Sequence, residues 1–189
     1  MRALMLEAPE SMLDDRRRRG ADRWDEVWEG VLHMVPPPFW QHQHIGSVLQ
    51  FVLHPHAERA GFQLTYESGL FRPGSYNNDY RVPDLMAAPT SSITKRGVEG
   101  PAAFLTEILS PDDESYEKLP FYAEMGVGEV LILDPESRMF EFYVLRGGQM
   151  RLVQPDSTGR VYSEALGVSF QGVAGPKLRV AWDGGQADV

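Results

Sequence analysis

Cysteine is absent from the 189 residues of this chain, and lysine occurs only three times against fifteen arginines. Without cysteine the chain has no disulfide framework, no thiolate zinc site and no cysteine nucleophile. Any bound metal must therefore be held by oxygen or imidazole ligands. The absence also agrees with a reducing compartment.

Long apolar runs are missing as well. No segment approaches the ~20 apolar residues that a membrane-spanning helix needs. The first residues, MRALMLEAPES, lack the basic start and the apolar core of a signal peptide. We therefore expect a cytoplasmic protein with no membrane partner.

The overall composition is that of a globular protein, with 42% hydrophobic and 24% charged residues. A chain of this length can bury roughly 70% of its unfolded surface in one domain. We expect a single domain over residues 1–182 and a disordered tail over residues 183–189, DGGQADV.

The net charge of -9 opposes broad attraction to a polyanion such as DNA. Binding to nucleic acid would then depend on a local basic strip. The four arginines at residues 16–19 are one candidate for such a strip, and the other interpretation of this run is a solvated helix face.

Hydrophobic spacing predicts the elements of the N-terminal half. Residues 8–19 read as a polar helix stopped by Gly20, and residues 23–36 as one strand. Residues 39–59 form the best amphipathic helix, with Pro55 as a candidate early end. Its apolar positions are Ile45, Val48, Leu49, Val52 and Leu53.

Strand signals dominate the remainder. Residues 62–71 and 79–88 are strand-like around a turn-rich stretch, and residues 102–109 and 129–135 are apolar enough for buried strands. A helix is expected over 116–125 between them, capped by the acidic residues after Pro111, and a hairpin over 138–155. Residues 161–173 and 177–182 add edge strands or extended packing segments. This order predicts an α/β or α+β fold with a mixed sheet and a right-handed crossover.

Two carboxylates fall within the predicted central strands. Glu107 lies inside the apolar run FLTEIL, where an ionised carboxylate costs several kcal/mol unless it is paired or bound to a metal. Asp84 follows a proline in VPDLMAAP. Two neighbouring carboxylates need a cation, and Mg²⁺ prefers such oxygen ligands.

The segments VPDLMAAP and FLTEILSPDDESYEKLPFYAEMGVGEVLILDP resemble the Uma family of bacterial restriction endonucleases, which belongs to the PD-(D/E)XK nuclease superfamily. The shared motifs are E-I-L-S-P, K-x-x-x-Y, G-V-x-E and D-P, with weaker similarity in EGVLHMVPPP and the QHQH helix. The resemblance implies a restriction-endonuclease-like mixed sheet flanked by helices. It also implies a metal-dependent endonuclease whose partner is nucleic acid, DNA above all.

The resemblance further assigns residue roles. Asp84, Glu107 and the backbone carbonyl of Ile108 are expected to hold Mg²⁺ or Mn²⁺. Leu109 stands where the superfamily has its catalytic lysine, and Lys118, eleven residues after Glu107, is expected to take that role. The alternative interpretation of Lys118 is a solvated helix lysine. The alternative interpretation of Asp84 is a simple carboxylate at the end of a strand.

Two further residues match the family pattern more weakly. Glu29 is a candidate to bind metal through water or to orient Lys118. His44 is a candidate to contact substrate phosphate or to brace Glu29. The five histidines, which all lie between His33 and His56, lack the spacing of a zinc site.

Other motifs favour ordinary packing. Ser110 has no nucleophile elbow around it. Trp24, Trp28, Phe39 and Trp40 have two interpretations, as base-stacking residues or as packing between the N-terminal strand and the long helix, and we expect packing. The alternative function is an inactive nuclease-fold protein that binds nucleic acid or a protein partner. In either case a homodimer is the expected assembly.

Overall fold

The structure is a computed structural model that describes residues 3–5, 8–75, 78–111 and 114–189. Its elements, in chain order, are β1 (Ala3–Met5), α1 (Glu10–Arg19), β2 (Glu26–Trp28), β3 (Val31–Met34), α2 (Trp40–Arg59), β4 (Phe62–Tyr66), β5 (Leu70–Phe71), β6 (Tyr80–Arg81), β7 (Leu85–Pro89), the 3-10 turn η1 (Thr90–Ser92), β8 (Val98–Glu99), β9 (Phe104–Ile108), α3 (Leu119–Glu124), β10 (Glu129–Leu133), β11 (Phe140–Arg146), β12 (Gln149–Leu152), β13 (Arg160–Ser163), β14 (Val168–Val173), β15 (Lys177–Trp182) and β16 (Gly185–Asp188).

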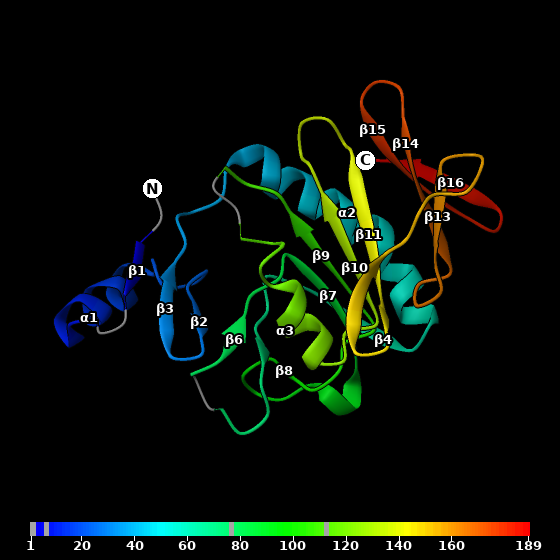
Figure 1. The fold of residues 1–189 in the computed structure, drawn as a ribbon. Helices are drawn as coiled ribbons and strands as arrows, with labels where there is room; N and C mark the ends of the chain where they lie inside the picture. Colours follow the sequence, from blue (N-terminus) through cyan, green and yellow to red (C-terminus); the bar gives the residue numbers. More distant parts are fainter. Residues whose placement is uncertain (1–2, 6–7, 76–77, 112–113) are drawn as a thin grey trace.

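Within these described ranges the strands form three sheets (Figure 1). The central sheet has the order β12-β11-β10-β9-β7-β4. An N-terminal sheet has the order β1-β3-β2-β6-β5-β8, and a C-terminal sheet has the order β13-β14-β15-β16. The mixed α+β class predicted from the sequence is confirmed.

The central sheet buries the two strands that the sequence marks as apolar. β9 and β10 pair in parallel, with Glu107 opposite Ile132, and every residue of both strands is buried. The other pairs of this sheet are antiparallel. A strand buried on both faces reads as a continuous hydrophobic run, which is why these two strands were predictable.

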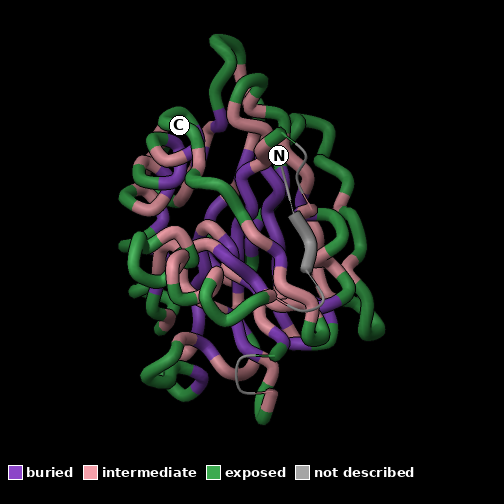
Figure 2. The backbone as a smooth tube through the Cα atoms, turned by 90° about the vertical axis from the view of Figure 1, so that its left-hand side faces the viewer, coloured by how far each residue is buried: buried purple, intermediate pink, exposed green. Residues whose placement is uncertain are grey.

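The two faces of the central sheet carry different cores. Phe104 and Ile108 of β9 pack into a cluster with α2 and the C-terminal sheet. Leu105 packs into a second cluster with Phe121 and Tyr122 of α3. Because side chains alternate along a strand, Glu107 shares the face of Leu105 and points towards α3. Figure 2 shows the buried residues gathered in the middle of the molecule.

Helix α2 confirms the prediction for residues 39–59, because Pro55 lies inside the helix without ending it. Its buried face includes His42, Ile45, Leu49 and Leu53 at helical spacing. In the part of the chain that the structure describes, no helix is both long enough and apolar enough to cross a membrane.

Several expected boundaries were wrong. Residues 23–36 form two strands, because Glu29 and Gly30 adopt φ values of 49° and 88° and make a turn between β2 and β3. Residues 62–71 divide between β4 and β5, which lie in different sheets. The helix expected over 116–125 is the shorter α3. Asp112 and Asp113, two of its expected capping residues, lie outside the described residues.

The C-terminal tail also differs from the prediction. Residues 183–189 were expected to be disordered, but Gly185–Asp188 form β16, which pairs antiparallel with β15. Gly184, with a φ of 87°, supplies the turn between the two strands. Val189 and Leu178 then exchange backbone hydrogen bonds of 2.8 and 2.9 Å.

Candidate active site

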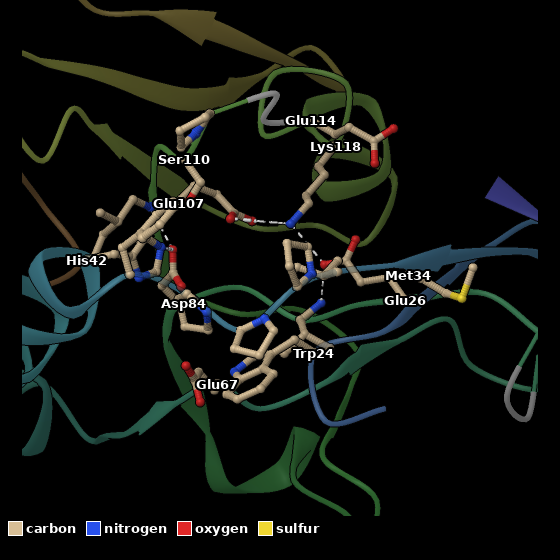
Figure 3. A pocket seen from close by; sticks show the side chains of 18 residues that line it. Trp24, Glu26, Met34, His42, Glu67, Asp84, Glu107, Ser110, Glu114 and Lys118 are labelled. Atoms are coloured by element: carbon tan, nitrogen blue, oxygen red, sulfur yellow. Dashed lines mark hydrogen bonds and ion pairs between the residues drawn. The ribbon is translucent and has the colours of Figure 1, made fainter. Parts of the chain in front are cut away.

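A pocket of about 150 Å³ lies where the C-terminal end of β9 meets the start of β7, the N-terminal hairpin and α3 (Figure 3). Among the described residues, five carboxylates and the ammonium group of Lys118 line it. These carboxylates belong to Glu26, Glu67, Asp84, Glu107 and Glu114.

Asp84 lies directly before β7. Because β7 runs antiparallel to β9, with Leu85 opposite Thr106, the start of β7 meets the end of β9. Asp84 Oδ2 accepts a 2.7 Å hydrogen bond from the backbone N–H of Ile108. The sheet pairing thus brings together all three predicted metal ligands.

Glu107 is only 3% exposed and faces α3. Both of its carboxylate oxygens lie 3.3 Å from Nζ of Lys118, and Oε1 also accepts a hydrogen bond from the hydroxyl of Tyr122. Burial, together with the charge of Glu107, raises the pKa of Tyr122 well above its ordinary value. The hydroxyl therefore stays protonated and remains a donor to Glu107.

Lys118 lies at the N-cap of α3, and its side chain is 11% exposed. Its Nζ is 2.9 Å from Oε1 of Glu26, besides its contacts with Glu107. The interpretation of Lys118 as a solvated lysine is therefore wrong. Short as it is, α3 holds this ammonium group inside the pocket.

Glu26, which sequence reasoning missed, is the acidic residue that the N-terminal hairpin contributes. Its Oε1 accepts a 2.8 Å hydrogen bond from the backbone N–H of Val82, and its Oε2 accepts one of 2.7 Å from Nε1 of Trp28. The predicted Glu29 does not line the pocket. It is exposed in the β2–β3 turn, and its backbone N–H donates to Asp79 at 3.3 Å.

His42 lines the pocket, and the predicted His44 does not. Nε2 of His42 lies 3.3 Å from Oδ2 of Asp84. Burial lowers the pKa of His42, but its hydrogen bond with Asp84 and the nearby negative charges outweigh this effect and raise it overall. Residues two apart on a helix point about 200° from each other. His44 is accordingly exposed and stacks on Trp40. The sequence carried a signal for this difference. His42 lies three residues before the apolar Ile45, so the two residues share one face of the helix.

The arginine run at residues 16–19 does not face this pocket. Arg16 contacts Asp25, and the other three pair with Asp14 or Asp15 on their own helix at 3.0 to 3.3 Å. The run is therefore matched by acidic neighbours. Arg23, outside this run, pairs with the pocket-lining Glu67 at 3.0 Å.

The donor chemistry of the pocket fits a hard divalent cation. In the described part of the chain no group of three histidine, aspartate or glutamate side chains is arranged to hold a metal. A site here would combine Asp84 and Glu107 with the carbonyl of Ile108. Mg²⁺ is commonly bound by one or two carboxylates and keeps several waters. The excess of buried carboxylates over cations also calls for positive charge.

A comparison with solved structures concerns the fold. The chain is similar to a structure described as a "putative nuclease belonging to DUF820" from Anabaena variabilis, with a TM-score of 0.58 and 20% identity. The match covers 75% of this chain and 83% of that one. At this identity the comparison shows a shared fold.

The family follows from a second comparison. The model of the Uma2 family, described as "Putative restriction endonuclease", matches residues 14–179. The chain belongs to the Uma2 family, which confirms the resemblance found in its motifs. A comparison with curated proteins gives no match.

Proposed function

We propose that this protein is a divalent-metal-dependent nuclease that hydrolyses phosphodiester bonds in nucleic acid, with DNA as the expected substrate. The observation that carries the proposal is the convergence of Asp84, Glu107 and Lys118 on one pocket. Family membership supports the reaction class, but a shared fold does not establish an activity.

Asp84, Glu107 and the carbonyl oxygen of Ile108 would hold Mg²⁺ or Mn²⁺. When bound, such an ion polarises a phosphoryl oxygen and lowers the pKa of bound water. The chain's own contribution to the metal site is orientation. His42 fixes one oxygen of Asp84, and Tyr122 fixes one oxygen of Glu107. Partners of this kind hold ligand carboxylates in place.

Lys118 supplies the positive charge of the chemistry. Its ammonium group lies between Glu26 and Glu107, so its position is set from two sides before substrate arrives. A preorganised cation at this point stabilises negative charge that develops on the phosphate, and it can also orient the attacking water. Glu26 is a positioning residue for Lys118.

Cleavage of supercoiled plasmid and of single-stranded DNA tests the proposal. The wild-type protein and Glu29→Gln should cut in Mg²⁺ or Mn²⁺ and stop in chelator. Glu107→Gln and Lys118→Ala should each lose activity by at least about 100-fold, the scale of removing one charge-stabilising group. Wild-type cleavage in chelator, or full activity in Lys118→Ala, would contradict the proposal. Binding without any cutting by the wild type would favour the inactive binding protein.

A further inference from the structure

Glu67 joins the carboxylate pocket to a second pocket. This second pocket has a volume of about 580 Å³ and lies between α1, the N-terminal hairpin and the short strands β5 and β6. Glu67 and Val82 line both pockets, so the two spaces adjoin at these residues. Figure 3 shows Glu67 on the side of the first pocket away from Lys118.

The backbone of Glu67 ties this residue to a predicted metal ligand. Glu67 follows β4 with a φ of 48°, in the left-handed region that residues with long side chains rarely adopt. Its N–H donates a 2.9 Å hydrogen bond to the carbonyl oxygen of Asp84. Strained backbone of this kind clusters at functional sites, where surrounding contacts hold it in place. Glu67 is thereby held beside Asp84.

Polar contacts also fix the side chain of Glu67, which is only 3% exposed. Its Oε1 accepts a hydrogen bond from Nε2 of Gln43, and the hydroxyl of Tyr66 donates to Oε1 of Gln43 at 3.0 Å. Burial, with the charges of Asp84 and Glu67, raises the pKa of Tyr66, so the hydroxyl stays protonated. Because its oxygen accepts from this hydroxyl, the Gln43 amide turns its NH₂ group to Glu67. The carboxylate is therefore oriented before any ligand binds.

Arg23 contacts the other oxygen of this carboxylate. Nη2 of Arg23 lies 3.0 Å from Oε2 of Glu67, and the Arg23 side chain is 62% exposed. Within the described ranges of the chain, this ion pair is the only polar contact of the Arg23 side chain. A guanidinium group has five N–H donors, so contact with one carboxylate oxygen leaves donors for a second anion. The pair buries its negative group and exposes its positive group.

Four aromatic residues were expected to pack between the N-terminal strand and the long helix, and they differ in the structure. Phe39 and Trp40 are 68% and 77% exposed, so the expected packing role is wrong for them. Trp28 does pack, because its ring stacks on a histidine of β3 with centroids 4.1 Å apart. The ring of Trp24 lies 5.4 Å from the guanidinium carbon of Arg23. Attraction between this cation and the ring supports Arg23 from a second side.

Exposure separates the charges of the second pocket. Three arginines and three acids line it: Arg16, Arg17, Arg23, Asp22, Asp25 and Glu67. Arg16 and Asp25 contact each other, and their side chains are 21% and 5% exposed. Arg17 is 62% exposed, in a surface ion pair on its own helix, where such a pair contributes little. Among these lining residues Asp22 is the exposed acid, so the exposed arginines Arg17 and Arg23 outnumber it.

We propose that Arg23 binds a phosphate of the nucleic-acid strand next to the scissile phosphodiester, and that Glu67 is the positioning residue that holds Arg23 there. Guanidinium groups match phosphate through paired N–H donors. The contacts from Asp84 through Glu67 to Arg23 set the spacing between the scissile phosphate and its neighbour. The inference rests on the proposed nuclease function for the identity of the ligand.

Fluorescence anisotropy with a labelled single-stranded oligonucleotide and the matched duplex tests this inference in chelator, where the nucleic acid stays intact. Arg23→Gln should weaken binding of the tighter ligand by roughly 10-fold, the scale of one charge-assisted hydrogen bond. The slope of log K against log salt should fall in magnitude by about 0.7 for the single strand or about 0.9 for the duplex, because one phosphate contact is lost. Arg23→Lys keeps the charge, so it should keep the wild-type slope and regain part of the affinity. A merely structural role of Arg23 would leave the slope of Arg23→Gln unchanged.

Arg19→Gln is the matched control. Arg19 carries the same charge, is 73% exposed, pairs with Asp15 and lines neither pocket. Its replacement should change the affinity by less than about 2-fold and leave the salt slope at the wild-type value.

Glu67→Gln tests the positioning role by the sign of its effect. Removal of a negative charge strengthens the binding of a polyanion when the charge acts alone, and Asp22→Asn, an equal change in the same pocket, should show that effect. Glu67→Gln should instead weaken binding by at least about 3-fold, because Arg23 loses its charged partner. Arg23→Gln, at an exposed position, keeps the test independent of any folding defect in Glu67→Gln.

Any of three results would overturn the inference. They are equal binding by Arg23→Gln and Arg19→Gln, tighter binding by Glu67→Gln than by the wild type, and no binding of either oligonucleotide by the wild type at low salt. Arg23-dependent binding without metal-dependent cleavage would refute the proposed nuclease and leave this inference standing. Metal-dependent cleavage with the same KM in Arg23→Gln as in the wild type would refute this inference and leave the nuclease standing.

Discussion

Buried carboxylates around Lys118 define the site at the scale of single residues. Glu107 was predictable, because an acid inside an apolar strand needs a compensating charge. Glu26 was not predictable, because its position depends on a hairpin turn that the sequence pattern did not reveal. The turn at Glu29 leaves Glu26 inside and Glu29 outside. His42 and His44, by contrast, could be separated by helix phase, because only His42 shares the buried face of Ile45.

Glu26→Gln and Glu29→Gln form a matched test of this correction. Glu26→Gln removes the charge opposite Lys118, so metal-dependent cleavage should fall at least about 10-fold and the free energy of unfolding by about 1–3 kcal/mol. Glu29→Gln, on the exposed turn, should change stability by less than about 0.5 kcal/mol and leave cleavage intact. Nuclease rates and urea unfolding measure both effects. A larger loss of cleavage or of stability in Glu29→Gln than in Glu26→Gln would show that Glu29, and not Glu26, belongs to the site.

At the scale of elements, the parallel pair of β9 and β10 sets the position of Glu107. Both strands and the helix between them were predicted from apolar runs and spacing. Their close approach at the start of β10 was not, because it depends on a glycine. A Cβ on Gly128 would lie 2.8 Å from the backbone oxygen of Ala103. Gly128 also donates its N–H to the carbonyl oxygen of Ala102 at 2.9 Å.

Gly128→Ala should therefore destabilise the protein by about 1–3 kcal/mol, because the added methyl group meets backbone that cannot move aside cheaply. Gly172→Ala is the control, since a Cβ on Gly172 meets nothing within 4 Å. It should change stability by less than about 0.5 kcal/mol. Chemical denaturation of the two variants gives the comparison. Equal free energies of unfolding would show that the strands tolerate more separation than their packing indicates.

At the scale of the whole molecule, the C-terminal sheet packs against the central sheet and α2. Phe170, Leu178 and Val180 belong to the same core cluster as Ile45 of α2. The sequence predicted strands here but not their partners, because pairing between distant segments leaves little trace in local spacing. It also predicted a disordered end where β16 completes the sheet. Both the strand partners and the ordered C-terminal end depend on contacts that form only in the assembled fold.

Glu129 joins the two sheets. This buried carboxylate on β10 accepts hydrogen bonds from Ser163 and from the backbone N–H groups of Glu164 and Ala165. Burial raises the pKa of Glu129 despite these bonds. A raised folded-state pKa means that its stabilising contribution is fully present below the unfolded pKa. That contribution is lost as the pH rises through the folded pKa.

Urea unfolding of the wild type and Glu129→Gln between about pH 4 and pH 8 tests this linkage, since an unfolded glutamate titrates near pH 4.3. The stability of the wild type relative to Glu129→Gln should increase as the pH falls, because the amide does not titrate. A difference that stays constant over this range, or one that increases with pH, would contradict the account of Glu129.

The central claim is that Asp84 and Glu107 form a divalent-cation site beside Lys118. Calorimetric titration of Mn²⁺ into the wild type, Glu107→Gln and Glu29→Gln tests it most directly, because it measures the site without any assumption about the nucleic acid. The account predicts binding by the wild type and Glu29→Gln, with loss of binding in Glu107→Gln. Equal binding by wild type and Glu107→Gln, or no binding by any of the three proteins, would contradict it.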